Sequence, residues 1–307
     1  MAISASLFQK VVLELLTTAA IDLPSDVINN LQEKAVLEDS PLAKKQFESI
    51  LENCRIASEK RVGVCQDNGL VLLFADVGQA CQMEGDFQEA ANMAVQDGTK
   101  SIPLRENVIH PLTKKNTGTN VGPHLPYIHW RMVPESDYIE VTVAPKGYGA
   151  EMRVSQSWVL SSEDVNECVR RLALDAVADA MGEPCPPVIM GIAVGGHFES
   201  NMVLAKRALF REPLGKPSDD PHAAKLEKEI LEAVNNLKLG PMGFGGNTYA
   251  LAVHIEVSGA HTAEIPITVA FQCWAHRYSK ARIYNNGNVE YLTHPKCNCS
   301  SGGLSDE

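Results

Sequence analysis

Three side chains that could bind a metal or a polar substrate follow one another directly: Cys65, Gln66 and Asp67. A cysteine thiolate is a soft metal ligand, and the amide and carboxylate beside it add polar groups at the same place. Gly69 then allows a sharp turn into the apolar run 70–74, which predicts a buried strand. A lone cysteine before a strand is more often a small buried hydrophobic residue, so Cys65 by itself leaves both interpretations open.

Two later segments also combine a cysteine with an apolar run. Cys185 stands among three prolines before the run 188–194, and Cys273 follows the run 265–271. With these segments the chain resembles the alpha subunit of the iron-sulfur hydro-lyases, the two-subunit class I fumarate hydratases and L(+)-tartrate dehydratases. Further matching segments, which together with these cover most of residues 60–280, are 115–118, 143–147, 191–196, 204–209 and 240–248.

The resemblance implies a 4Fe-4S cluster bound by the thiolates of Cys65, Cys185 and Cys273. A cluster of four irons ordinarily takes four cysteines, one per iron, so three cysteines leave one iron with an open coordination position. Such an iron can bind a substrate hydroxyl and carboxylate and act as a Lewis acid on the departing hydroxide, without a redox change. The implied reaction is the reversible dehydration of a 2-hydroxy dicarboxylate.

The resemblance also implies roles for residues around the cluster. Asp67 and His261 are expected to be catalytic. The expected substrate-binding residues are Gln66, Arg105, Lys146 and Gly147. An arginine offers a planar fork of donors that suits a carboxylate, and an imidazole titrates near physiological pH. The residue types alone leave open that Arg105 is a surface ion pair and that His261 is a satisfied buried histidine.

The chain departs from the family pattern at two places. Asn68 stands where the cysteine motif usually has threonine, and residues 148–150 replace most of a run of glycines and serine. Residues 272–277 (Gln-Cys-Trp-Ala-His-Arg) resemble tartrate dehydratases, whereas residues 195–196 and 240–248 resemble fumarases. The sequence therefore leaves both substrates open.

The family's complete site also uses a second domain or a separate beta subunit, which supplies further carboxylate-binding groups and the base that removes the carbon-bound proton. Only 34 residues follow Cys273, too few for such a domain. We therefore expect a beta subunit as partner, a small dicarboxylate as substrate and an α2β2 assembly. The partner-facing surface should include Cys65, Arg105 and His261.

The composition is that of an ordinary globular protein, with 45% hydrophobic and 21% charged residues. No uninterrupted apolar stretch is long enough to cross a bilayer, so no membrane span is expected. A formal net charge of -11 would repel a phosphate backbone, which argues against nucleic acid as a partner. The first residues lack the pattern of a secretory signal, and we expect a cytoplasmic protein. In that reducing compartment the eight cysteines are thiols or metal ligands rather than disulfides.

Apolar residues at helical spacing predict that the first sixty residues are helical. Within them, Ser40 and Pro41 mark a helix start, with Cys54 on the apolar face of the helix that follows. Another helix is expected to reach Met181 from a capping box of Ser161 and Asp164. Its apolar face carries Cys168, so we expect both cysteines in the core.

The later segments mix strands and helices rather than alternating them strictly. The runs 127–133 and 138–144 predict two paired strands joined by a turn. Other expected elements are helices at 87–95, 198–210 and 222–237 and strands at 188–194, 249–257 and 268–271. We therefore expect an α+β fold, with a mixed sheet flanked by helices and a helical N-terminal region. The expected divisions are a helical region packed on the main lobe (1–60), a hydro-lyase alpha domain (61–295) and a flexible tail (296–307).

Two other classes of protein remain open. A zinc-dependent enzyme or structural zinc protein would also use cysteine and histidine, but the only close pair, Cys297 and Cys299, lacks a second pair at finger-like distance. A non-catalytic interaction protein is the other class, if all the cysteines lie in the core. The glycines of 240–248 do not form a phosphate loop, because Gly246 stands where that motif has lysine, and they favour close backbone approach near the site instead.

Overall fold

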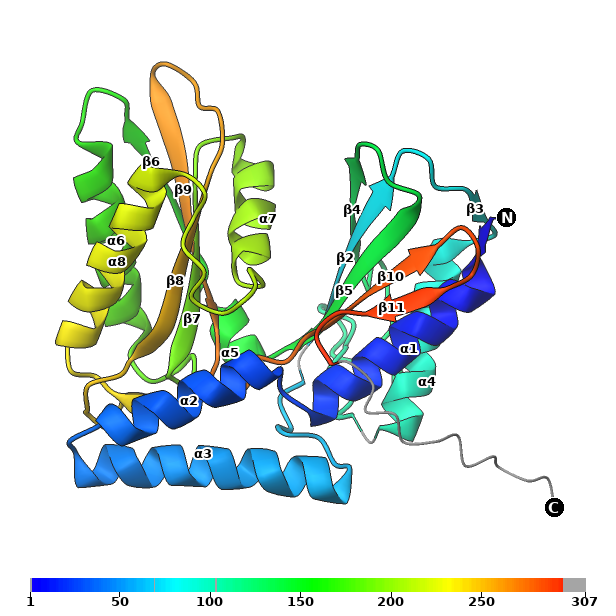
Figure 1. Ribbon diagram of the computed structural model, residues 1–307, viewed down its shortest axis with the longest axis horizontal. Helices are drawn as coiled ribbons and strands as arrows, with labels where there is room; N and C mark the ends of the chain where they lie inside the picture. Colours follow the sequence, from blue (N-terminus) through cyan, green and yellow to red (C-terminus); the bar gives the residue numbers. More distant parts are fainter. Residues whose placement is uncertain (1, 69, 103, 295–307) are drawn as a thin grey trace.

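The computed structural model of the chain describes residues 2–68, 70–102 and 104–294 (Figure 1). Its helices are α1 (Ala5–Ile21), α2 (Ser25–Leu37), α3 (Pro41–Lys60), α4 (Phe87–Ser101), α5 (Tyr148–Glu151), α6 (Val165–Ala180), α7 (Phe198–Ala208), α8 (Pro221–Asn236) and the 3-10 turn η1 (Pro241–Gly243). Its strands are β1 (Ile3–Ser4), β2 (Leu70–Gly78), β3 (Met83–Glu84), β4 (Ile128–Val133), β5 (Tyr138–Lys146), β6 (Ser155–Leu160), β7 (Val188–Val194), β8 (Ala250–Val257), β9 (Glu264–Gln272), β10 (Ser279–Tyr284) and β11 (Val289–Tyr291). The predicted α+β class and helical N-terminal region are confirmed. The predicted tail, 296–307, lies outside the described residues.

The three N-terminal helices are shared between two hydrophobic cores. Helix α1 packs on β5, β10 and α4, whereas α2 and α3 pack on each other beneath the lobe that holds β7, β8 and β9 (Figure 1). Cys54 and Cys168 are both buried in the core of that second lobe, as predicted. Among the described residues, no helix is long and apolar enough to cross a membrane.

Side-chain caps set where two of the expected helices begin. The Ser40 hydroxyl accepts a hydrogen bond from Ala43 N (3.3 Å), with Pro41 as the first helical residue, as predicted. Helix α6 differs from the prediction, because Asp164 is itself the N-cap and accepts from Glu167 N (3.2 Å). The Ser161 hydroxyl instead donates to the carbonyl of Thr262, so it ties β6 to the β8–β9 loop.

A five-stranded sheet with the order β11-β10-β5-β2-β4 forms one lobe. The predicted pairing of the strands at 127–133 and 138–144 is wrong, because β2 lies between β4 and β5, parallel to the first and antiparallel to the second. The end of β2 fits beneath the connection, where Gln79 N donates to Val133 O (3.0 Å) and Ala80 N donates to Ser136 O (2.9 Å). Gly78 makes this approach possible, since a Cβ there would overlap the Ser136 carbonyl.

A four-stranded sheet with the order β6-β9-β7-β8 forms the other lobe, so the strands are divided between two mixed sheets. Strand β7 matches the predicted run 188–194, and nearly all its residues are buried. Helices α6 and α8 cover one face of this sheet, and α7 covers the other (Figure 1). Gly191 brings α7 onto β7, because a Cβ there would overlap the carbonyl of Ala205.

Substitution of Gly191 by alanine should therefore separate α7 from the sheet. We expect the free energy of unfolding to fall by about 1–3 kcal/mol, the usual cost of overpacking a core. Urea denaturation measures the change, with Gly259→Ala as the control, because a Cβ at Gly259 would have no neighbour within 4 Å. Equal stability of the two variants would show that the close contact at Gly191 is wrong.

Candidate functional site

Strand pairing brings the segments that carry the predicted site residues together at one end of each sheet. Leu70, the first residue of β2, pairs with Lys146, the last residue of β5. The segment of Cys65 and the segment of Lys146 and Gly147 therefore lie at the same end of the five-stranded sheet. In the other sheet Ile189, near the start of β7, pairs with Gln272, the last residue of β9. The segments that carry Cys185 and Cys273 therefore also lie together.

Hydrogen bonds then connect the three cysteine segments to one another. The Arg277 guanidinium donates to the carbonyl oxygens of Cys65 (3.4 Å) and Asp67 (2.6 Å). The amide of Trp274, directly after Cys273, donates to the carbonyl of Cys185 (3.1 Å). The structure thus brings together three cysteines that are far apart in the sequence.

The thiols are close enough to influence one another electrostatically. Burial raises the pKa of the Cys185 thiol to about 11, with smaller contributions from the charges of Cys273 and Cys65. Burial also raises the pKa of the Cys273 thiol, and the positive charges of Arg277 and Lys146 act in the opposite direction. Because a metal ligand must be deprotonated, a metal centre here would replace the thiol protons.

A turn supported by the glycine-rich loop 240–248 positions Cys185. The residue has a left-handed backbone (φ 55°), and its amide donates to Gly182 O (3.1 Å). From the other side Met242 N donates to Pro186 O (2.9 Å). Gly182 is needed here, because a Cβ would lie 2.8 Å from Met242 O. Gly243 of the loop is needed in the same way, because a Cβ there would lie 2.9 Å from Gly182 Cα, so both glycines allow close backbone approach beside a cysteine.

Asp67 and Gly147 fit closely against each other. The Asp67 carboxylate accepts hydrogen bonds from Tyr148 N (2.7 Å) and Gly149 N (3.5 Å), at the start of α5. A Cβ at Gly147 would lie 3.4 Å from both the carbonyl and a carboxylate oxygen of Asp67. Backbone amides therefore fix the orientation of the carboxylate, and the absent side chain of Gly147 leaves room for it.

A pocket of about 590 Å³ opens beside Cys65. Gln66, Asn68, Arg105 and Arg277 supply its polar lining. With its amide oriented to accept, the Asn68 side chain receives a hydrogen bond from Arg105 N (3.1 Å). The volume suits a small ligand, and the Arg105 guanidinium in the lining suits an anion. Arg277 was not among the predicted site residues, although its place four residues after Cys273 is a signal that could have found it.

Lys146 points away from this pocket. The side chain is buried, and its ammonium donates to the carbonyl of Phe271 and to Gln272 Oε1 (3.1 Å), with Glu151 at 3.6 Å. Burial lowers the pKa of Lys146 to about 8, although the charge of Glu151 opposes the shift. Lys146 therefore links the end of β5 to the end of β9.

His261 does not lie with the other predicted site residues. It stands in the exposed β8–β9 loop, where it accepts from Ala263 N (3.2 Å) through Nδ1. Cys273 follows the other end of β9, a strand of nine residues. At ~3.3 Å per residue, the strand separates His261 from Cys273 by about 30 Å within one chain.

The three cysteines fit a cluster better than a single ion. Within residues 2–68, 70–102 and 104–294, no group of three or more His, Cys, Asp or Glu could hold a metal ion. A four-iron cluster has a different requirement, because each thiolate binds a different iron and the sulfurs need not converge on one point. Cys297 and Cys299, the close pair considered for zinc, lie outside the described residues.

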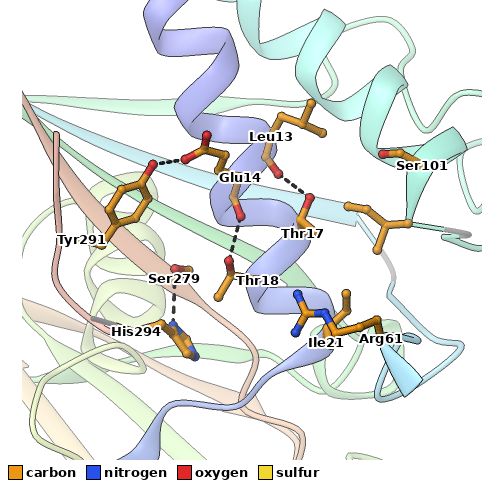
Figure 2. Close-up of a pocket in the computed structure, with 11 residues that line it drawn as sticks. Leu13, Glu14, Thr17, Thr18, Ile21, Arg61, Ser101, Ser279, Tyr291 and His294 are labelled. Carbon is orange, nitrogen blue, oxygen red and sulfur yellow. Dashed lines mark hydrogen bonds between the residues drawn. The ribbon is translucent and has the colours of Figure 1, made fainter. Parts of the chain in front are cut away.

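A second pocket, of about 620 Å³, lies on the other side of the end of α1. Figure 2 shows hydrogen bonds that several of its polar side chains, among them Thr17, Thr18 and Tyr291, make within the protein. The hydroxyls of Thr17 and Thr18 donate to the α1 carbonyls of Leu13 (2.7 Å) and Glu14 (2.9 Å). Arg61 pairs with Asp22 (2.7 Å). This pocket holds none of the predicted site residues, so the pocket beside Cys65 is the stronger candidate.

The fold and the site together define the class of protein. Three cysteines from the ends of two sheets lie together, beside a pocket that suits an anion. Residues 9–282 match the family model described as Fumarate hydratase (Fumerase), and the chain belongs to that family. It is 41% identical over 276 residues to "Putative L(+)-tartrate dehydratase subunit alpha" of Methanocaldococcus jannaschii, a match that covers 89% of this chain and 96% of that protein. It is 31% identical over 274 residues to "L(+)-tartrate dehydratase subunit alpha" of Escherichia coli (strain UTI89 / UPEC), covering 89% and 90% respectively.

The burial of Lys146 predicts a pH dependence of stability. Its pKa is about 8 in the folded chain against 10.5 normally, so the buried ammonium costs the native state stability below pH 8, and the cost disappears as the pH rises to 10.5. From pH 7 to pH 10 the wild type should therefore gain up to about 3 kcal/mol relative to Lys146→Met.

Urea denaturation of both proteins at the two pH values measures this difference. Lys225→Met, which alters an exposed lysine on α8, serves as the control. A difference between wild type and Lys146→Met that is the same at pH 7 and pH 10 would contradict the burial of a titrating ammonium.

Proposed function

We propose that the chain is the cluster-bearing alpha subunit of a hydro-lyase that reversibly dehydrates a 2-hydroxy dicarboxylate. The observation that carries this proposal is the convergence of Cys65, Cys185 and Cys273, linked by the bonds of Arg277 and Trp274. The family membership and the hydro-lyase names of the relatives support it. A 4Fe-4S cluster held by the three thiolates would supply a Lewis-acidic iron with an open position.

The chain's own residues would bind and orient the substrate. Arg105, on the pocket wall with Gln66, offers a planar pair of donors to a substrate carboxylate. Asp67, held by two backbone amides, presents a carboxylate that can accept a hydrogen bond from the substrate hydroxyl. Gly147 keeps the space beside that carboxylate open. Lys146 would act indirectly, by holding the end of β9 that precedes Cys273.

The complete site would need other chains. The word "alpha" in the relatives' names implies a second kind of subunit in those enzymes, and we propose a beta subunit that contributes the base acting on the carbon-bound proton. His261 stands about 30 Å from Cys273 within one chain. If His261 is catalytic, it would therefore act in the active site of another alpha subunit. An α2β2 assembly would provide that second copy.

Replacement of Cys185 by serine should remove the cluster. We expect the anaerobically reconstituted variant to lose most of its iron and sulfide, because serine is a poor ligand for iron in such clusters. Its activity, assayed with the beta subunit added, should fall at least about 100-fold. Cys168→Ser is the matched control, since Cys168 is buried on the core-facing side of α6. Counting iron, sulfide and zinc also tests the zinc alternative, and a zinc-loaded, colourless wild type would contradict the proposal.

The isolated chain should be inactive even with its cluster. Neither hydration of fumarate nor dehydration of L-tartrate should exceed background until the beta subunit is added, because proton abstraction and hydroxide departure must be positioned together. Assays of both reactions before and after mixing measure this. Full turnover by the alpha chain alone would contradict the proposed division, and the reaction restored by mixing identifies the substrate.

A further inference from the structure

Arg277 is a fully buried arginine at the junction of the three cysteine segments. Its exposed fraction is 0%, and it is among the largest fully buried side chains of the described chain. Two of its nitrogens donate to the carbonyls of Cys65 and Asp67, and Nε has no partner. The guanidinium lies beside Gly147, where a Cβ would be 3.5 Å from Nη2.

The described residues give Arg277 no ion pair within 4 Å, and the Asp67 carboxylate beside Gly147 accepts from the amides of Tyr148 and Gly149 rather than from the guanidinium. The other deeply placed arginines behave differently. Arg211, whose side chain is 12% exposed, pairs with Glu227 (2.5 Å) and Glu256 (2.6 Å). Arg207 pairs with Asp76 (2.9 Å). A buried charge without an opposite charge is strongly unfavourable, and carbonyl dipoles compensate it only in part.

The groups near Arg277 that are or can become negative are the Asp67 carboxylate and the cysteine thiols. Cys273 precedes it by four residues, and the positive charge of Arg277 opposes the rise that burial causes in the pKa of Cys273. Cys65 is joined to the guanidinium through its own carbonyl oxygen (3.4 Å). Thiols are neutral until they lose their protons, and metal binding is the process that removes those protons.

We propose that Arg277 is the counter-charge of the cysteine thiolates, and a positioning residue that holds the Cys65 segment against the Cys273 segment. The proposal rests on the proposed function, because the thiolates exist as such only when they bind the cluster. In the metal-free chain the buried guanidinium has no ion-pair partner among the described residues. In the loaded chain it faces a centre whose ligands carry negative charge.

Loss of the Arg277 charge should therefore affect the thermal stability of the metal-free chain and of the cluster-loaded chain differently. In Arg277→Gln the amide can still donate to a carbonyl, but the positive charge is gone. The metal-free variant loses one hydrogen bond and is freed of a buried charge that has no ion-pair partner, so its thermal midpoint should stay within about 2 °C of the wild type or rise. The loaded variant loses an attraction to the thiolates, so its midpoint should fall. A purely structural tie would predict a fall in both forms.

The experiment compares wild type, Arg277→Gln, Arg277→Lys and Arg211→Gln, each metal-free and each anaerobically reconstituted. For loaded Arg277→Gln we expect iron release to a chelator to be at least about tenfold faster and the reduction potential of the cluster to shift to more negative values. Arg277→Lys keeps the charge, so its potential should stay near that of the wild type. Arg211→Gln is the matched control, because it leaves two carboxylates unpaired and should lower the midpoints of both forms alike.

Each result separates the inference from the function on which it rests. A wild type that takes up no iron refutes the proposed function. A wild type that loads normally, together with an Arg277→Gln that loses stability equally in both forms or fails to fold without metal, overturns the inference alone. An unchanged potential in Arg277→Gln would also overturn it.

Discussion

The site depends on one constraint, the antiparallel pairing of strands. In each pair that matters here, one strand begins at the end of the sheet where its partner ends. Strand β2 begins where β5 ends, and β7 begins near where β9 ends. The segment before one strand and the segment after its partner must then lie together, whatever their separation in the sequence. A slip of one residue in either register would turn every side chain to the opposite face of its sheet. In β7 the contact of Gly191 with Ala205 opposes such a slip, because a residue with a side chain cannot take that place.

Two buried cations connect these sheet ends, and each reaches from one lobe to the other. Lys146, at the end of β5, donates to the carbonyl of Phe271 in β9. Arg277, beyond the end of β9, donates to the carbonyls of Cys65 and Asp67 ahead of β2. Backbone carbonyls offset part of the cost of burying a charge, and the cationic side chains are long enough to span the junction. Substitution at either position would therefore disturb cysteine segments as well as the charge beside them.

The sequence predicted the buried strand β7 and the Ser40 cap of α3 well, because those signals are local, whereas the cap of α6 is Asp164 rather than Ser161. The pairing of β4 with β5 was wrong, since alternation predicts strands but does not reveal that the end of β2 passes beneath their connection at Gly78. The burial of Arg277 could not be read from composition, because an arginine after a strand is usually exposed. The remote position of His261 follows from the length of β9, which a motif match does not take into account.

A metal centre held by the three cysteines would couple the two lobes mechanically, because the cysteines are divided between them. Cys65 belongs to the end of the five-stranded sheet, whereas Cys185 and Cys273 belong to the end of the four-stranded sheet. A cluster held by all three would bridge the lobes through covalent metal-sulfur bonds, in addition to the hydrogen bonds that join them without metal. Loading would then fix the relative position of Arg105 on one lobe and Cys273 on the other. That relative position decides whether a substrate carboxylate on Arg105 can lie beside an open iron position, so cluster binding and substrate orientation would depend on the same junction.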